Sequence, residues 1–374
     1  MEQAVVCNYI GKKGGGPLYA YEMTKGLIEN GVNVIAIIPD NIENLDMWEA
    51  LEGCRLVKIK GYKDNYLSFL CAAVRILFFE KRRIRKACSG IEILGVYIPM
   101  IQPLSLLINR FFKKKQTIVT LHDPIPHKGC GKLYAKVCEK TAVNADNIVV
   151  LSEKFVNITA EHYKINPQRV HVIPHGIFDN YKKVYDKKLK HKFDNQKINF
   201  LFFGRITPYK GLDVLAEAYR RLSAEHPDVA LTLVGNGDFS PYKEAYENLK
   251  NVTIVNRWIR DEEVYGYFDN EDIITVLPYI EATQSGVIPV AMACGSMVVC
   301  SDCGGLSEQV EDGVTGKLVR PGDADDLYKA MKEVTVNGID RKIVNNAMKY
   351  INDLSWDKLS RGLIQIIKES EGKK

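Results

Sequence analysis

Short apolar runs alternate with longer amphipathic segments through the first half of the chain. The apolar runs predict strands near residues 4–9, 32–38, 55–59, 91–97, 117–121, 147–151 and 170–173. The amphipathic segments predict helices near residues 18–30, 66–87, 102–112, 131–144 and 152–163. Strands that are apolar on both faces and alternate with helices indicate βαβ units and a parallel sheet covered on both sides.

The second half of the chain repeats this alternation. Apolar runs predict strands near residues 198–203, 229–234, 252–255, 272–277 and 297–300, and residues 355–369 predict a closing amphipathic helix. Between the halves, residues 179–197 are charged and lack apolar periodicity, which is typical of an interdomain linker. Because 374 residues are too many for one compact core, two α/β domains are expected.

The stretch 198–222 carries the clearest chemical signal. Its strand ends at Phe203, Gly204 allows a turn, and Arg205 and Lys210 flank a loop that leads into an amphipathic helix. In open α/β sheets a ligand lies beyond the carboxyl ends of the strands. Two cations beside free backbone N–H groups suit a diphosphate there. The alternative interpretation is a surface turn with solvated charges.

Three further segments lie at expected strand ends. The sequence GKKGGGP at 11–17 is not a Walker A loop, but its glycines permit close approach of the backbone to a ligand. His122 opens a loop stiffened by prolines, where it either lines a site or lies on the surface. Thr283 and Ser285 can cap the next helix, so that its first N–H groups face an anion.

Composition narrows the remaining possibilities. A net charge of +5 is too small to indicate a nucleic-acid partner, and nine scattered cysteines without an evident signal peptide favour a cytoplasmic protein with reduced thiols. Cys300 and Cys303 form a CxxC without a second pair, and we interpret them as packing residues. His122, His127 and Cys130 have loosely metal-like spacing without an evident fourth ligand. No metal site is therefore expected.

The positive charge is unevenly distributed along the chain. Residues 55–86 contain ten Lys or Arg against two acidic residues, an excess of eight, interleaved with aromatic side chains such as Phe78 and Phe79. Another basic run, 113–115, follows two phenylalanines. Basic residues beside aromatic ones resemble an interfacial membrane surface. The alternative is a solvated helix face above an ordinary core.

Several motifs together resemble the retaining glycosyltransferases of family 4, which have the GT-B fold. The motifs are FFGRITPYKGLDVL at 202–215, LTLVGNGD at 231–238, VIPHGI at 172–177, TLHD at 120–123 and VLSE at 150–153. The resemblance covers nearly the whole chain and is strongest over 198–323. It implies two Rossmann-like, doubly wound domains facing a central cleft. These are an acceptor-side domain at 1–180, to which a helix at 356–374 crosses back, a linker at 181–197, and a nucleotide-sugar donor domain at 198–355.

The resemblance also assigns site residues. It implies contacts with the donor diphosphate for Gly14, Gly15, Arg205, Lys210, Ser285, Gly286 and Val287. It places the nucleobase and ribose near Gly235, Arg257, Trp258 and Ile259, and gives catalytic positions near the transferred sugar to His122 and Glu281. The family often has a second glutamate, which is separated from the first by seven residues and binds the ribose. Val290 occupies that position here, so ribose recognition is expected to come from elsewhere.

The expected activity is metal-independent transfer, with retention, of a hexose-type sugar from a UDP- or GDP-linked donor. The expected acceptor is a glycan or polyprenyl-linked glycan in cell-surface polysaccharide synthesis, reached by a cytoplasmic protein in peripheral contact with the inner face of the membrane. No cofactor and no nucleic-acid partner are expected. Two alternatives remain open: a GT-B sugar-nucleotide epimerase, and a non-catalytic nucleotide-sugar-binding subunit.

Overall fold

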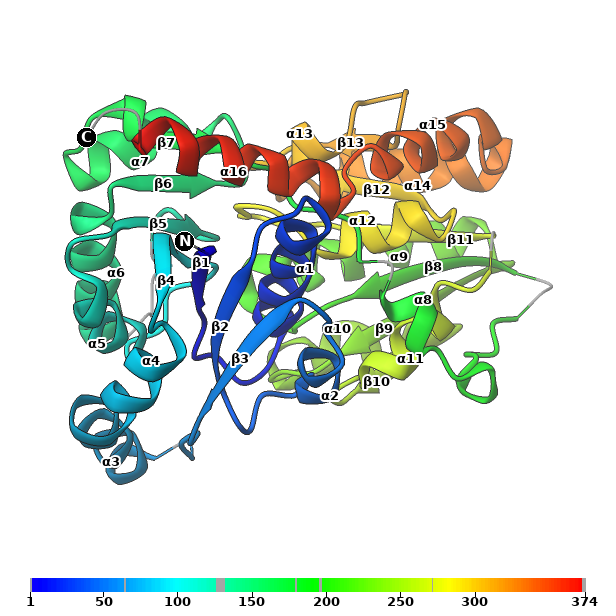
Figure 1. Cartoon of the computed structure of the whole chain (residues 1–374). Helices are drawn as coiled ribbons and strands as arrows, with labels where there is room; N and C mark the ends of the chain where they lie inside the picture. The colour runs from blue at the N-terminus through cyan, green and yellow to red at the C-terminus, as the bar shows by residue number, and fades with distance from the viewer. Residues whose placement is uncertain are drawn as a thin grey trace. The chain divides into compact units, whose positions relative to one another are not determined.

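The computed structural model describes residues 2–63, 65–125, 132–178, 180–194, 197–270 and 272–371. The chain divides into two compact units, which are coloured by residue number in Figure 1. The first unit combines residues 1–174 with the C-terminal segment 355–374, and the second contains residues 175–354. In this division the segment 181–197, which the sequence assigns to a linker, belongs to the second unit.

The first unit is built on a parallel sheet of seven strands in the order β3-β2-β1-β4-β5-β6-β7. The strands are β1 (Glu2–Asn8), β2 (Val34–Pro39), β3 (Cys54–Ile59), β4 (Ile91–Ile98), β5 (Gln116–Leu121), β6 (Asn147–Val150) and β7 (Val170–Val172). Every residue of β2 and β5 is buried. Burial on both faces is why these strands are almost continuously apolar.

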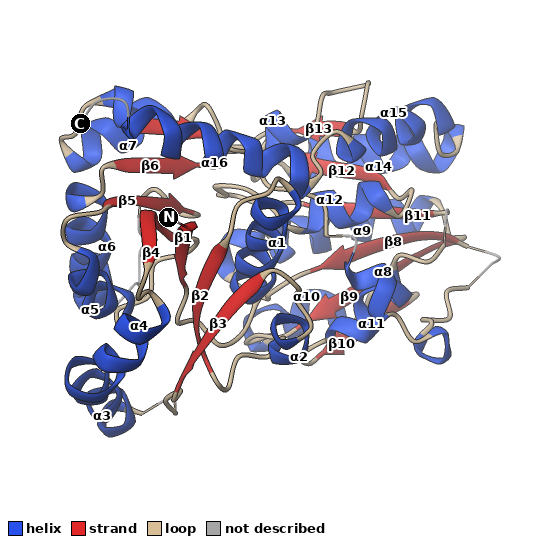
Figure 2. Ribbon diagram, in the orientation of Figure 1, coloured by secondary structure: helices blue, strands red, loops and turns tan. Residues whose placement is uncertain are grey.

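Helices cover both faces of this sheet (Figure 2). On one face, α1 (Gly15–Glu29) packs against α16 (Trp356–Glu371), the helix that returns from the end of the chain. On the other face the strands share one apolar cluster with several helices. These helices are α3 (Tyr66–Arg75), α4 (Lys81–Ala87), α5 (Ser105–Asn109), α6 (Lys132–Asn144) and α7 (Phe155–Tyr163). The short α2 (Leu45–Glu49) follows β2.

The second unit repeats the topology with a parallel sheet of six strands in the order β10-β9-β8-β11-β12-β13. The strands are β8 (Ile198–Phe203), β9 (Val229–Gly235), β10 (Val252–Asn256), β11 (Ile273–Leu277), β12 (Met297–Ser301) and β13 (Lys317–Val319). The helices are α8 (Asn180–Val184), α9 (Leu212–Glu225), α10 (Lys243–Glu247), α11 (Asp261–Val264), α12 (Val287–Ala293), α13 (Leu306–Gln309), α14 (Ala324–Asn337) and α15 (Arg341–Asn352).

The predicted α/β class is confirmed, because both sheets have the strand order of a doubly wound Rossmann-like domain. Two local predictions differ from the structure. The edge strand β13 has only three residues, too few for a recognisable apolar run. The single helix predicted over 66–87 is divided by a π-helical turn, η1 (Ile76–Glu80). Such a turn inserts a residue without changing the composition of the segment, so the sequence does not reveal it.

Candidate functional site

The strand order fixes where a ligand can bind in each unit. In a doubly wound sheet the crevice lies beyond the carboxyl ends of the two strands at which the winding reverses. These are β1 and β4 in the first unit, and β8 and β11 in the second. The first unit holds the predicted site residues Gly14, Gly15 and His122. The second holds Gly235, Arg205, Lys210, Arg257, Trp258, Ile259, Glu281, Ser285, Gly286 and Val287.

The loop after β8 is held by the loop after β9. The Gly204 N–H donates a hydrogen bond of 2.9 Å to the Val234 carbonyl. The backbones then approach so closely that a Cβ on Gly235, whose φ is +146°, would lie 1.7 Å from the Gly204 oxygen. Only glycine fits such a position. Arg205 extends from this loop with an exposed side chain, which makes no ion pair in the described part of the chain.

The same loop is also tied to the loop after β11. Lys210 ends a short 3-10 helix, and Gly211 follows it with a φ of +65°. A Cβ on Gly211 would lie 1.9 Å from the Pro278 carbonyl oxygen. Directly before Lys210, the Tyr209 carbonyl accepts a hydrogen bond of 2.8 Å from the Ile280 N–H. Lys210 is therefore held at the edge between β8 and β11.

An aromatic ring that the sequence analysis missed lies directly beneath this cation. The Lys210 Nζ is 3.4 Å from the centroid of the Tyr279 ring, a close cation–π contact. Tyr279 is fully buried, and its hydroxyl lies 3.4 Å from the Ser285 Oγ. Burial raises the pKa of the Tyr279 phenol far above its usual value, so the hydroxyl stays protonated. Tyr279 thus connects Lys210 with the start of α12.

Replacing Tyr279 by leucine should weaken binding of a nucleoside diphosphate by about 2- to 30-fold, the range of a cation–π contact. Tyr279→Phe keeps the ring and should retain most of the affinity. Calorimetric titration of both variants, on samples shown to be folded by circular dichroism, measures the difference.

A double-mutant cycle tests whether Tyr279 acts through Lys210. Once Lys210→Met has removed the ammonium, Tyr279→Leu should cost little further affinity. Additive losses in the double variant, or equal losses in the Phe and Leu variants, would contradict this role.

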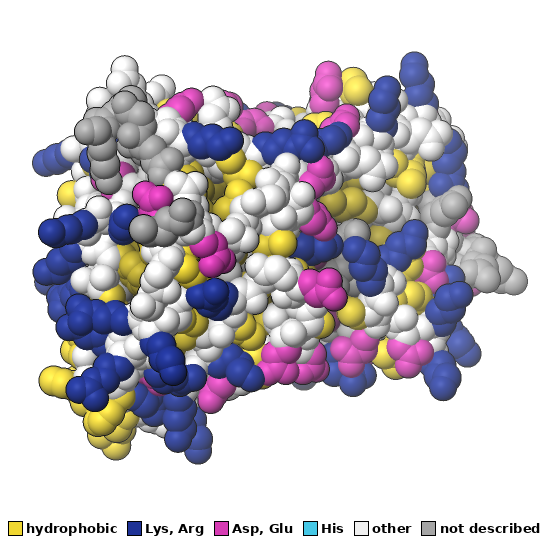
Figure 3. Space-filling view, viewed as in Figure 1, with side chains coloured by type: hydrophobic (Ala, Val, Ile, Leu, Met, Phe, Trp, Pro, Cys, Tyr) yellow, Lys and Arg dark blue, Asp and Glu magenta, His cyan; other side chains and the backbone are white. Residues whose placement is uncertain are grey.

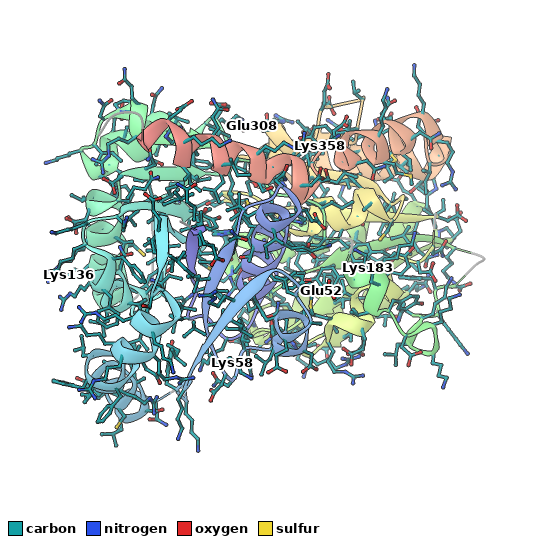
Figure 4. All side chains as sticks on the ribbon, viewed as in Figure 1. Glu52, Lys58, Lys136, Lys183, Glu308 and Lys358 are labelled. Atoms are coloured by element: carbon teal, nitrogen blue, oxygen red, sulfur yellow. The ribbon has the colours of Figure 1, made fainter. Side chains whose placement is uncertain are left out.

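A second residue missed by the sequence analysis, Gln309, clamps the start of α12. Its side-chain oxygen accepts from the Ser285 N–H at 2.9 Å, and its amide nitrogen donates to the Ser285 carbonyl at 3.0 Å. The Val287 N–H donates to the Ser285 hydroxyl at 3.3 Å. Of the three N–H groups expected to face phosphate, those of Ser285 and Val287 are thus engaged, and that of Gly286 has no partner among the described residues. Gln309 belongs to α13, on which Figure 4 labels Glu308.

Two further features border this helix start. Glu281 is exposed in the loop between Tyr279 and α12. The ring of His175, in the VIPHGI motif, lies beside Gly286, since a Cβ there would be 3.7 Å from the His175 Nε2. Val290, at the position of the absent second glutamate, is buried within α12 and packs as a core residue.

The loop after β10 is held by an ion pair between Arg257 and Glu263. Both terminal nitrogens of Arg257 donate to the Glu263 carboxylate, at 3.0 and 2.6 Å. Hydrogen bonding to Arg257 lowers the pKa of Glu263 to about 2, so the pair stays charged across the physiological range. Ile259 is buried, whereas Trp258 is 46 % exposed. Of the four residues expected near the nucleobase and ribose, Trp258 is therefore the one whose aromatic side chain is open to stacking.

In the first unit, the glycine turn and the histidine lie at the same edge of the sheet. Gly14 precedes α1 with a φ of +89°, a backbone conformation that residues other than glycine rarely adopt. His122 follows β5, and the edge of its ring contacts Tyr19 of α1 with ring centroids 4.5 Å apart. The sheet order and this contact place Gly14, Gly15 and His122 around the N-terminus of α1.

The environment of His122 defines its hydrogen-bonding roles. Its Nε2 lies 3.0 Å from the Pro99 carbonyl oxygen, which can only accept, so Nε2 carries the proton. Burial lowers the pKa of His122 from its usual 6.5, and the ring is neutral at pH 7. The Nδ1 lone pair can therefore accept a hydrogen bond from a hydroxyl group.

Within the residues that the structure describes, no three His, Cys, Asp or Glu side chains gather closely enough to hold a metal ion. His127 and Cys130, which have loosely metal-like spacing from His122, lie outside the described residues.

Family models match both halves of the chain. Residues 13–180 match the model described as Glycosyltransferase Family 4, and residues 197–337 match the one described as Glycosyl transferases group 1. The predicted family is confirmed by these matches together with relatives that are named glycosyltransferases.

Three proteins illustrate the similarity. An uncharacterized glycosyltransferase of Methanocaldococcus jannaschii is 28 % identical over 340 residues, which cover 86 % of this chain and 79 % of the relative. The D-inositol 3-phosphate glycosyltransferase of Corynebacterium aurimucosum is 30 % identical over 53 % of this chain and 51 % of its own length. The crystal structure of Anabaena HepE in complex with UDP has a TM-score of 0.72 at 16 % identity and covers 98 % of this chain and 100 % of HepE. Such structural matches confirm the GT-B fold.

Proposed function

The chain belongs to glycosyltransferase family 4 and is a transferase, and from that membership we propose that it moves a hexose-type sugar from a UDP- or GDP-linked donor with retention of configuration. The observation that carries the proposal is the pair of cations at the β8/β11 edge, with the Lys210 Nζ fixed 3.4 Å over Tyr279. A nucleoside diphosphate is the group that two cations at a Rossmann switch point suit. UDP in the similarly folded HepE supports this donor class.

In the proposed reaction the bond between the sugar C1 and the diphosphate oxygen breaks. Arg205, Lys210 and the Ser285 hydroxyl stabilise the negative charge that develops on the leaving diphosphate. The acceptor hydroxyl attacks C1 on the same face, and its proton passes to a leaving phosphate oxygen. The neutral His122 accepts a hydrogen bond from a sugar or acceptor hydroxyl at Nδ1, and Glu281 binds sugar hydroxyls. Arg205 and Lys210 balance the negative charge of the diphosphate, so the proposal includes no metal ion and no cofactor.

The proposed acceptor is a glycan or polyprenyl-linked glycan in cell-surface polysaccharide synthesis. A polyprenyl-linked acceptor keeps its reactive end at the headgroup level of a membrane. The proposal therefore places the protein in the cytoplasm, in peripheral contact with the inner face of the membrane. Within the described residues, no helix is both long and apolar enough to cross a bilayer.

A donor screen followed by a product assay tests this function. A nucleotide sugar at a hundred times its dissociation constant should add about 2.7 kcal/mol to the free energy of unfolding and raise the melting temperature. With the stabilising donor and a glycan acceptor, free nucleoside diphosphate should be released in excess EDTA. No stabilisation by any UDP- or GDP-sugar would contradict the donor assignment. Activity lost in EDTA and restored by Mg²⁺ or Mn²⁺ would contradict metal independence.

A further inference from the structure

The segment from α3 to α4 is apolar on two faces. Its inner face, with Ala72, Ile76 and Ile84, is buried in the apolar cluster of the first unit. Its outer face exposes between 41 and 74 % of five large apolar side chains: Leu67, Leu70, Val74, Phe78 and Phe79. These five residues, which we call the apolar stripe, recur mostly every three or four positions and so share one side of the helix. A helix that covers one core needs only the inner face, so the stripe is surplus to folding.

The π-helical turn η1 contributes two members of the apolar stripe. Phe78 and Phe79 are adjacent in this turn, yet both are about 70 % exposed. A π-helical turn is often associated with a functional site, because its formation sacrifices regular helix geometry. Here the distorted turn carries two exposed aromatic side chains.

A groove of about 430 Å³ runs along the apolar stripe. Leu70, Val74 and Phe79 form its apolar lining, and Arg75, Glu80 and Arg83 are among the charged residues around them. The Glu80 carboxylate accepts a hydrogen bond of 3.1 Å from Arg83. The negative charge of Glu80 is therefore balanced by Arg83, which also lines the groove.

A second hollow of about 410 Å³ lies between α4 and the segment 110–115. Five cations line this hollow, which we call the basic pocket: Arg85, Arg110, Lys113, Lys114 and Lys115. Isoleucine and phenylalanine side chains also line it, and no acidic side chain is among its described lining residues. The Lys81 Nζ of α4 is 5.9 Å from the ring of Phe111, which links the two walls. Such a concentration of cations suits phosphate groups.

The charge of this face contrasts with that of the remaining chain. Segments 66–87 and 110–115 contain ten Lys or Arg and one acidic residue, an excess of nine, whereas the whole chain carries +5. All other residues therefore sum to −4. In Figure 3 the hydrophobic side chains gather at the lower left, where Figure 1 shows α3, with Lys and Arg side chains around them.

We propose that this face docks onto an anionic lipid bilayer, with the apolar stripe among the acyl chains and the basic pocket on headgroup phosphates. A bilayer satisfies both surfaces at once, because it presents a negative layer above an apolar one. An acidic protein would match the charge alone. The inference deepens the membrane contact of the proposed function, on which it rests for the location of the acceptor.

Flotation of the full chain with vesicles tests the proposal. The protein should bind phosphatidylcholine vesicles that contain phosphatidylglycerol and not vesicles of phosphatidylcholine alone, and salt should weaken the binding. Changing Lys113, Lys114 and Lys115 together to Gln should reduce partitioning about a hundredfold, since each cation contributes about fivefold. Phe78→Ser with Phe79→Ser should reduce it more than about tenfold. Both variants should melt as the parent does, because four of these side chains are exposed and Lys115 is only partly buried.

Matched substitutions in the second unit provide the controls. Lys187→Gln with Lys188→Gln, and separately Val336→Ser, should leave vesicle binding unchanged. Equal binding to neutral vesicles, or full binding by both test variants, would overturn the proposal.

Release of nucleoside diphosphate with a water-soluble acceptor separates this inference from the proposed function. Normal release without vesicle binding would refute the docking surface alone. Vesicle binding as expected, without release for any donor, would refute the proposed function alone.

Discussion

Arg205→Ala and Lys210→Ala should each lower kcat/KM for the nucleotide sugar by about 10- to 150-fold. Hydrogen bonds to charged groups are typically worth about 1.5–3 kcal/mol. Both cations lie at the β8/β11 edge, where Arg205 is exposed and Lys210 is only partly buried. The fold should therefore survive, and steady-state kinetics with melting temperatures in parallel measure the loss.

The two substitutions should act on phosphate and not on the base. Affinity for a nucleoside diphosphate should fall in both variants, while affinity for the nucleoside alone should stay unchanged. Lys243→Ala, which removes an exposed lysine from α10, serves as the matched control. If both variants transferred sugar at a near-normal rate, the assignment of the diphosphate site would be wrong.

His122→Ala should reduce kcat by about a hundredfold, the cost of losing the alignment of a reacting group. The dissociation constant of the donor should change much less, because the neutral ring positions a hydroxyl and carries no charge toward the diphosphate. Stopped-time assays at saturating donor, with calorimetry for binding, separate the two quantities. Equal losses in turnover and in donor affinity would make His122 a plain binding residue.

The pH dependence gives His122 a second test. Burial holds its pKa below 6.5, so the folded protein binds the proton less readily than the unfolded chain does. Stability contributed by the neutral ring is present above about pH 6.5 and is lost as the pH falls further. The acid limb of kcat should have its midpoint below 6.5 and should disappear in His122→Gln. An unchanged acid limb in that variant would assign the titration to another group.

The fold, and the position of two cations after β8, were predictable because their signals are local. The strand β8 is an unbroken apolar run, and Arg205 and Lys210 follow it within a recognisable loop. The doubly wound arrangement follows from strands that alternate with helices, a pattern that a sequence records directly.

Residues that support the site from a distance were not predictable. Gln309 pairs with the backbone of Ser285, which lies 24 positions earlier in the sequence, and Tyr279 meets Lys210 only because Gly211 allows their loops to touch. In the sequence, Gln309 is a glutamine in a short helical segment and Tyr279 is an aromatic residue after a proline, and neither pattern indicates a role. Phe78 and Phe79 show the same limit, because nothing in their spacing tells an outward face from an inward one before the fold is known.

The return of α16 to the first unit has a consequence for biosynthesis on the ribosome. Asn30 donates a hydrogen bond of 2.7 Å to the Asp357 carbonyl, Gln116 donates one of 2.9 Å to that of Ile367, and Tyr19 packs against Trp356. The half of the protein that is translated first thus lacks these partners until residues 175–354 have been made, roughly 10–40 s later at ordinary elongation rates. The second unit, continuous in sequence, can acquire all its internal contacts before the first does. A segment translated after the second unit thus completes the first.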